Sequence, residues 1–318
     1  MISVKWKKDE LLDGSVRRMI EQVNQGKIIT RFDKTPVPNC PKDVVCPHFL
    51  EFKWGYGCPH MCAWCYLQGC LSRLQTKTRP VVKDLDVVKK HLISFLSVPH
   101  TQPEMLNSGE IADSLMSENM DRPLSKEIMP IVKGTPHKIL FLSKMTDIHH
   151  FLDNAEQWKE NAVMSFSINA YDVAERWEKL APHPKERIDA ATKLSKAGYQ
   201  VRLRIDPIVA VENWEYSYKA VIGNILSKFR PERITLGTLR GLVRVIAASR
   251  DRSWVKYLDE KTNFGKRISL PIRVKIYRTL IGYLKKKYDF DQVAICKDTV
   301  EVHDMVGSDW RNLRCNCV

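Results

Sequence analysis

Residues 49–66 of this chain read FLEFKWGYGCPHMCAWCY. The first six are mostly aromatic or aliphatic and end at glycines, which predicts a strand followed by a tight turn. Cys58, Cys62 and Cys65 come next, spaced four and then three residues apart. Thiolates are common ligands of iron–sulfur clusters, and three of them can bind three corners of a four-iron cube. The fourth iron then stays open for a small chelating molecule.

A zinc site and a disulfide are the alternatives for these thiols. Structural zinc usually needs a second Cys or His pair further along the chain, and although His60 lies inside the loop, no second pair follows at zinc-finger spacing. Disulfide frameworks are typical of small secreted domains. This chain has nine cysteines in 318 residues and begins without an apolar signal core. Metal or redox use is therefore favoured over disulfides.

Composition indicates the cellular location of the chain and the kind of partner that it binds. Hydrophobic residues make up 44% of it, enough for a sizeable core, and no stretch approaches the roughly 18 apolar residues of a membrane helix. We expect no membrane segment and a cytoplasmic location. The formal net charge of +14 favours a phosphate-bearing partner such as DNA or RNA, although a lysine-rich surface is the alternative.

Strand-like and helix-like segments alternate along the rest of the sequence. The expected strands are residues 49–54, 103–107, 138–142, 162–169, 199–205, 233–236 and 291–295, and the expected helices are 9–26, 84–96, 186–197 and 214–229. Such alternation predicts an α/β fold in which a parallel sheet curls into a partial TIM-type barrel. We expect an N-terminal helical extension over 1–48, the barrel over 49–245, and a C-terminal α/β extension over 246–318.

Polar side chains follow the predicted strands one after another. They are the cysteine loop, Glu110, Lys144, Ser167 with Asn169, Asp206, and Arg240. The carboxyl ends of parallel strands meet at one edge of a barrel, where the chemistry of such folds takes place. Each residue alone is a weak signal, but together they predict a functional rim.

Several motifs together resemble the spore photoproduct lyase group of the radical S-adenosylmethionine (SAM) superfamily, over roughly residues 49–318. They are Cys58-x3-Cys62-x2-Cys65-Tyr66-Leu67-Gln68, Ser143-Lys144, Phe166-Ser167-Ile168-Asn169, Ala197-Gly198-Tyr199, Asp206-Pro207-Ile208, Ile295-Cys296-Lys297-Asp298 and Cys315-Asn316-Cys317. The resemblance implies a partial (β/α)6 barrel. It also implies a 4Fe-4S cluster on the three cysteines and a SAM molecule, bound at the open iron, that is cleaved reductively to a 5′-deoxyadenosyl radical.

The resemblance also suggests how SAM is held. It implies that Tyr66, Lys144 and Ser167 help to seat it. The Lys144 ammonium can pair with the methionine carboxylate, and Glu110 can accept from the methionine amine. Asn169 is expected to reach the ribose hydroxyls, and we place Asp206 in the same cofactor-binding set.

One departure from the family concerns the hydrogen donor. The lyase that repairs spore DNA uses a cysteine shortly after the second strand, whereas residues 107–113 here contain no thiol. Trp64 also replaces a tyrosine usual in the family. Cys315 and Cys317 are therefore candidate catalytic residues, because Arg314 beside them would lower a thiol pKa. Alternatively, the pair ligates an auxiliary metal or has no chemical use.

These observations predict a radical SAM enzyme acting on a nucleic-acid base, in lyase-like repair or modification. Two alternatives stay open: a radical SAM enzyme acting on a small molecule or peptide, and a non-catalytic iron–sulfur or zinc protein that binds nucleic acid. The enzyme would need a reducing partner such as flavodoxin or ferredoxin, because SAM cleavage consumes an electron.

Overall fold

The computed structural model describes residues 2–32, 35–72 and 79–318. The strands are β1 (Val4–Glu10), β2 (Val16–Val23), β3 (Ile29–Phe32), β4 (Phe49–Phe52), β5 (Gly55–Tyr56), β6 (Val81–Val82), β7 (Met105–Asn107), β8 (Lys138–Ser143), β9 (Ala162–Ser167), β10 (Gln200–Ile208), β11 (Arg233–Thr238), β12 (Arg240–Leu242), β13 (Glu260–Thr262), β14 (Gly265–Arg267) and β15 (Val293–Ile295). The helices are α1 (Tyr66–Cys70), α2 (Leu85–Leu96), α3 (Leu124–Val132), α4 (His149–Asp153), α5 (Ala155–Trp158), α6 (Tyr171–Trp177), α7 (Pro184–Lys196), α8 (Trp214–Lys228), α9 (Val243–Ala248), α10 (Leu270–Tyr288), α11 (Val300–Val306) and the 3-10 helix η1 (Ser253–Tyr257).

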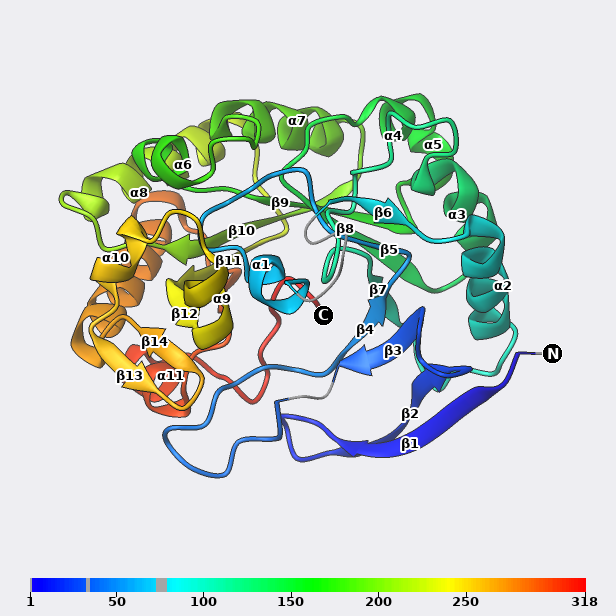
Figure 1. The fold of residues 1–318 in the computed structure, drawn as a ribbon, viewed down its shortest axis with the longest axis horizontal. Coiled ribbons are helices and arrows are strands. Elements are labelled where there is room, and N and C mark those ends of the chain that lie inside the picture. Colours follow the sequence, from blue (N-terminus) through cyan, green and yellow to red (C-terminus); the bar gives the residue numbers. More distant parts are fainter. Residues whose placement is uncertain (1, 33–34, 73–78) are drawn as a thin grey trace.

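A ten-stranded sheet organises the described chain, in the order β1-β2-β3-β4-β7-β8-β9-β10-β11-β15. From β4 onward each neighbouring pair is parallel. The six predicted barrel strands are confirmed in their predicted order, and the strand predicted at 291–295 adds a seventh parallel strand. The sheet is curved but open, with helices along its outer side and α1 near its centre (Figure 1). The predicted α/β partial barrel is therefore confirmed.

Local sequence explains why the covering helices begin where they do. The Asp84 carboxylate accepts hydrogen bonds from the amides of Asp86 and Val87 and so caps α2, whose buried face carries Val88 and Leu92. At α7, His183 and Glu186 form a reciprocal capping box and Pro184 occupies the first turn. Burial of these apolar faces against the sheet leaves the carboxyl ends of the strands to the connecting loops.

The helix predicted at residues 9–26 is wrong. This segment contributes to the antiparallel hairpin β1–β2, which turns where the Ser15 amide and hydroxyl donate to Asp13 Oδ1 at 2.9 and 2.6 Å. Gly14 adopts φ +79°, a left-handed conformation that ends any helical register. The apolar residues at near-helical spacing lie partly in the turn and partly on β2. The N-terminal extension is therefore three antiparallel strands joined to β4 through β3.

The segment Cys315–Val318 folds back into the molecule, and Figure 1 shows it ending near the centre of the fold. The Ser165 hydroxyl donates to Asn316 Oδ1 at 2.6 Å, and Arg202 Nη1 donates to the Asn316 carbonyl at 2.8 Å. Arg233 Nη1 donates to the Cys315 carbonyl at 3.1 Å. These contacts fix the segment against β9, β10 and β11. Within the described ranges, no helix combines the length and apolarity needed to cross a bilayer.

Candidate active site

The three predicted ligand cysteines lie on the loop that joins β5 to α1. Its backbone is held from several sides: the Cys62 amide donates to the His60 carbonyl at 2.8 Å, and Gln68 Nε2 donates to the Cys62 carbonyl at 2.5 Å. The Ala63 amide donates to the Trp177 carbonyl at 2.8 Å. Gly57, at φ +89°, makes the turn that starts the loop. The loop is therefore a fixed frame for its thiols.

All three thiols are free, with Cys62 buried and Cys58 and Cys65 half-buried. Burial raises the pKa of each, to about 12 for Cys62, and the thiols act on one another electrostatically. Each would lose its proton on binding iron, so metal loading would release protons. Three free, mutually interacting thiols on one rigid loop are a donor set that fits a cluster with three protein ligands.

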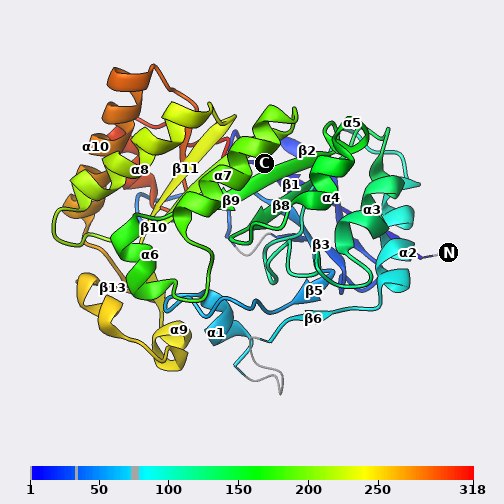
Figure 2. The ribbon, with the colours of Figure 1, turned by 90° about the horizontal axis from the view of Figure 1, so that it is seen from above.

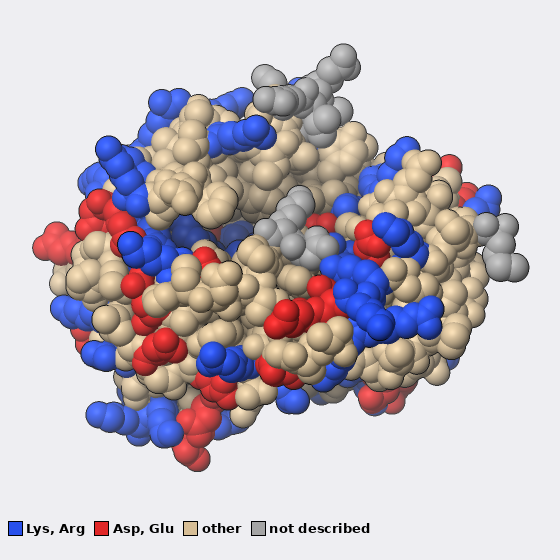
Figure 3. Space-filling view, turned by 90° about the horizontal axis from the view of Figure 1, so that it is seen from below, with Lys and Arg blue, Asp and Glu red and all other residues tan. Residues whose placement is uncertain are grey.

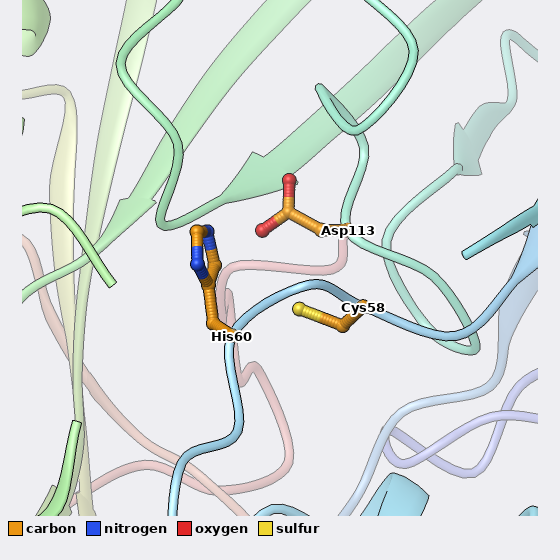
Figure 4. A group of neighbouring side chains, drawn as sticks. All are labelled: Cys58, His60 and Asp113. Atoms are coloured by element: carbon orange, nitrogen blue, oxygen red, sulfur yellow. The ribbon is translucent and has the colours of Figure 1, made fainter. Parts of the chain in front are cut away.

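A second set of donors shares this corner. One atom each of Cys58, His60 and Asp113 lies within 4.8 Å of the others, close enough to share a single ion (Figure 4). His60 Nδ1 lies 2.8 Å from the Leu180 carbonyl, while its buried Nε2 has no hydrogen-bond partner in the described structure. Asp113 also accepts from Ser143 Oγ at 2.5 Å and from the Lys144 amide at 3.0 Å. This arrangement keeps the zinc alternative chemically possible.

Tyr66 begins α1 directly after Cys65. Its hydroxyl is buried, and no partner for it is found among the described residues. Burial, with Glu110 as the next contribution, raises the Tyr66 pKa well above its usual value, so the group is a neutral phenol. A buried hydroxyl without a partner costs free energy unless a ligand or water satisfies it. This position fits the predicted cofactor contact.

Lys144 follows β8 and lies beside Glu178, with Nζ 3.7 Å from Oε1. Arg187 Nη1 binds the other oxygen of Glu178 at 2.7 Å. Burial would lower the Lys144 pKa, but Glu178 and Cys62 raise it above its usual value. Burial would likewise raise the Glu178 pKa, but Lys144 and Arg187 lower it. The site therefore holds a charged ammonium next to Cys62.

Ser167 and Asn169 lie at the end of β9, as predicted, and both are buried. The Asn169 amide is already engaged: Oδ1 accepts from the Tyr218 hydroxyl at 2.7 Å, and Nδ2 donates to the Pro207 carbonyl at 3.1 Å and weakly to Glu178 at 3.4 Å. These bonds join the ends of β9 and β10. The ribose contact predicted for Asn169 stays a prediction.

Asp206 lies on β10 between two arginines. Arg204 Nη2 binds Oδ2 at 2.6 Å, and Arg240 Nη2 contacts Oδ1 and Oδ2 at 3.0 and 2.9 Å. Burial would raise the Asp206 pKa, but Arg240 and Arg204 lower it to about 2. A Cβ on Gly237 would lie 2.6 Å from Asp206 Cγ, so this close packing requires glycine. Asp206 therefore forms an internal ion cluster, and a direct cofactor contact stays a prediction.

Glu110 follows β7 and is half-buried. Burial would lower the Lys297 pKa, but Glu110 and Cys46 raise it above its usual value. Glu110 and Cys46 therefore lie close enough to Lys297 to act on it electrostatically. Lys297 Nζ also lies 4.7 Å from the centre of the Phe32 ring. The predicted bond from Glu110 to the methionine amine stays a prediction.

Cys315 and Cys317 differ in their surroundings. Cys315 packs into an apolar cluster with Val45, Trp310 and Leu313. The Cys317 sulfur accepts from Asn107 Nδ2 at 3.7 Å, at the end of β7. The low thiol pKa expected from Arg314 is wrong for Cys317: a hydrogen bond with Cys315 and burial raise its pKa well above the usual value.

The sequence patterns did not single out Glu178, Arg187 or Asp113. Glu178 follows α6 rather than a strand, and Arg187 lies inside α7, where an arginine is usually solvent-facing. Asp113 lies six residues beyond β7. The sequence signal that was available is an arginine inside the predicted helix 186–197 with an acidic residue nine positions earlier.

A family model described as spore photoproduct lyase matches residues 51–239. The spore photoproduct lyase of Clostridium acetobutylicum is 25% identical over 169 residues, which cover 52% of this chain and 48% of that protein. The Bacillus subtilis lyase is 28% identical over 167 residues, or 51% and 46%. The chain therefore spans about half the length of the curated relatives it matches.

Solved structures agree with the fold. A spore photoproduct lyase complexed with dinucleoside spore photoproduct has a TM-score of 0.63 at 17% identity, covering 77% of this chain and 75% of that one. Native anSMEcpe with bound AdoMet has a TM-score of 0.51 at 11% identity, covering 77% and 62%. At these identities the likeness concerns the arrangement of strands and helices alone.

Proposed function

This chain belongs to the spore photoproduct lyase family, whose model matches more than half of it, and from that premise we propose that it is a radical SAM enzyme acting on a nucleic-acid base. The observation that carries the proposal is the rigid loop of three free thiols beside the charged Lys144, at the carboxyl ends of the parallel strands. A loop cysteine set next to an ammonium suits a cluster whose co-substrate bears a carboxylate.

Cys58, Cys62 and Cys65 would hold the 4Fe-4S cluster, with SAM at its open corner. When bound, the cluster supplies the electron that cleaves SAM to methionine and a 5′-deoxyadenosyl radical. Lys144 would turn from Glu178 to the methionine carboxylate, because its 3.7 Å contact is longer than a hydrogen bond while Arg187 keeps Glu178 paired at 2.7 Å. Tyr66 would donate its hydroxyl, which has no partner among the described residues, to the same ligand.

Cys317 would serve as the hydrogen donor. It lies beside Asn107 at the end of the second barrel strand. Arg204 and Glu110 lie close enough to act on its thiol electrostatically. A donor must carry its hydrogen, and the raised pKa keeps the Cys317 thiol protonated at neutral pH. The S–H bond would break homolytically, a C–H bond would form on the substrate radical, and the sulfur would be left as a thiyl radical.

Charge supports nucleic acid as the substrate class. The net charge of +14 favours a polyphosphate through counterion release. Figure 3 shows Lys and Arg side chains gathered around a hollow on the face it presents, with acidic side chains between them. The related lyase of known structure binds a dinucleoside spore photoproduct. A target base in a duplex would have to leave its stack to meet the rim residues.

The test of this function is anaerobic reconstitution with iron and sulfide, followed by SAM cleavage with irradiated and undamaged DNA. We expect roughly four iron atoms per chain, a visible absorption band and 5′-deoxyadenosine release. Cys62→Ala should remove the colour and the turnover, whereas Cys40→Ala, on an exposed loop, should keep both. A colourless wild-type protein, or one that fails to cleave SAM under strong reductant, would contradict the proposal.

The role of Cys317 has its own test. Cys317→Ala should still release 5′-deoxyadenosine but should lose the incorporation of solvent deuterium into the product, because a thiol hydrogen exchanges with water. Cys315→Ala should keep that incorporation and instead lower stability through its apolar cluster. Equal deuterium incorporation in wild type and Cys317→Ala would reject the assignment.

Zinc binding is the second candidate function, favoured by the Cys58–His60–Asp113 group. It predicts one zinc ion per chain after anaerobic purification, retained in Cys65→Ala and lost in Asp113→Asn. A small-molecule or peptide substrate would be indicated by deoxyadenosine release that a metabolite stimulates and an oligonucleotide does not. Salt-sensitive DNA or RNA affinity would argue against it.

A further inference from the structure

A small cavity of about 170 Å³ opens beside the cysteine loop. Its lining comes from the loop itself, from α1, from the end of α6 and from the turn after α9: Met61, Ala63, Gln68, Arg176, Trp177, Lys179, Leu180, Arg250 and Asp251. Figure 2 shows α1 and α9 next to each other on the lower side of the molecule, with α6 above α9. None of these residues is used in the proposed chemistry.

The rim of this cavity is cationic and its floor is apolar. Arg176, Lys179 and Arg250 are exposed, and Asp251 is the single acid among the nine lining residues. Leu180 is 62% exposed, a large apolar side chain left in water beside these cations. We call these four residues, Arg176, Lys179, Leu180 and Arg250, the outer patch. A cationic rim around an apolar centre is typical of a surface for transient binding of an acidic protein.

The outer patch is tied directly to the cysteine loop. Two lining residues, Met61 and Ala63, flank Cys62, and a third, Gln68, donates to the Cys62 carbonyl at 2.5 Å. The loop after α6 is anchored in turn, because His60 Nδ1 contacts the Leu180 carbonyl at 2.8 Å and the Trp177 carbonyl accepts from the Ala63 amide at 2.8 Å. A protein bound here would sit against the backbone of a cluster ligand.

We propose that the outer patch is the docking surface of a small acidic one-electron carrier of the flavodoxin type. The inference rests on the proposed function, since only a reducible cluster needs such a partner. In each encounter the carrier is oxidised by one electron and the cluster is reduced by that electron. The cavity lining does not include Lys144 or Glu110, so a carrier bound at the patch would not cover the residues proposed to contact SAM.

A nucleic-acid strand is the other polyanion that three cations could attract. The apolar centre at Leu180 and Met61 favours a protein, because phosphate tracking needs a continuous cationic groove and not an apolar floor. The DNA affinity of the patch variants is therefore measured beside their flavodoxin affinity.

The test measures binding and electron delivery separately on the cluster-loaded protein. The variant Arg176→Glu with Lys179→Glu should bind oxidised flavodoxin about tenfold more weakly in calorimetry at low salt, with the wild-type affinity itself falling as salt is raised. SAM cleavage driven by reduced flavodoxin should fall by a similar factor, while cleavage driven by dithionite, a small reductant that needs no docking surface, should stay unchanged.

Two further variants keep the outcome interpretable. Arg250→Glu acts from a different element and should weaken flavodoxin binding in the same direction, which guards against a local folding defect near Glu178. Lys193→Glu with Lys196→Glu makes the same charge change on exposed positions of α7 and should leave binding within about twofold of wild type.

Unchanged flavodoxin binding in both patch variants would overturn the proposal. So would a patch variant that loses DNA affinity but keeps flavodoxin affinity, because the patch would then bind nucleic acid. A wild-type protein that does not cleave SAM with dithionite would instead contradict the proposed function. The flavodoxin affinities of wild type and patch variants would still decide whether the patch binds the carrier.

Discussion

Two buried carboxylates at the carboxyl edge of the sheet each lie between two cations, but they hold those cations differently. Asp206 contacts Arg204 and Arg240 at 2.6–3.0 Å through both oxygens. Glu178 contacts Arg187 at 2.7 Å, whereas Lys144 stays 3.7 Å away. The first arrangement is complete, whereas in the second Lys144 has no close hydrogen bond within the described part of the chain.

The difference separates a structural group from an adaptable one. Every charge around Asp206 is bound within the protein, so moving any member would leave a buried charge unpaired. At Glu178 the Arg187 contact alone can neutralise the carboxylate, and the lysine can change partner at little cost. The looser pair is also the one next to the cysteine loop, where a carboxylate-bearing ligand is expected.

The substitution with the largest expected effect on stability is Asp206→Asn. It should lower the free energy of unfolding by about 3–5 kcal/mol, because two partly buried arginines would lose the buried carboxylate that pairs them. Chemical denaturation measures it. Asp189→Asn, at the exposed ion pair with Lys228, should change stability by less than about 1 kcal/mol. Similar decreases in unfolding free energy in both variants would show that the Asp206 cluster stabilises the fold no more than an exposed ion pair does.

Glu118 extends the comparison to a buried carboxylate held by the Ser125 hydroxyl and amide instead of by cations. Burial raises its pKa to about 7. The native state therefore keeps a proton that the unfolded state loses between pH 4.5 and 7, so stability falls as pH rises through this window. Relative to wild type, Glu118→Gln should gain up to about 3 kcal/mol between pH 4.5 and 8.

Denaturation midpoints of the two proteins, measured side by side across that pH range, test this prediction. The buried His137 and His303, whose pKa values burial lowers to about 4, give an opposite slope between pH 4 and 6.5 that is common to both proteins and cancels. Parallel curves for wild type and Glu118→Gln would mean that Glu118 is ionised in the native protein throughout.

Lys144→Met should have the smallest effect on stability, about 1 kcal/mol or less, because Arg187 still pairs Glu178. Its effect on SAM should be larger: affinity for the reconstituted protein, measured by calorimetry, should fall about tenfold through loss of the charge-assisted bond. Lys138→Met, at the opposite end of β8, where Nζ binds Gln200 at 2.9 Å, should leave SAM affinity unchanged. Equal SAM affinities in the two variants would show that Lys144 does not bind SAM.

Local patterns were sufficient for most of the barrel. The strand predicted at 138–142 is a nearly continuous apolar run, and β8 is buried along most of its length. Asp84 marked the start of α2 because its side chain can bind the first free amides of a helix. The same approach failed at residues 9–26, since five apolar positions near helical spacing also fit a hairpin once Asp13-Gly14 forms a turn.

The partners of the site residues were beyond such reasoning. Lys144 and Glu178 are 34 positions apart, and Asn107 and Cys317 are 210 apart, so no periodicity connects them. Only the packing of α6 and α7 against the sheet brings Glu178 between two cations. Only the return of residues 315–318 across β9 to β11 places a thiol where residues 107–113 have none.

The sequence by itself therefore determined the strand order, the cysteine loop and the side of the sheet on which polar groups gather, because parallel strands with right-handed crossovers allow one arrangement of their carboxyl ends. Tertiary structure alone decided which charges are bound and which stay available. That outcome depends on burial and on distances of a few ångströms between segments far apart in the chain, and the energy of a buried charge is set by such contacts and not by its neighbours in sequence.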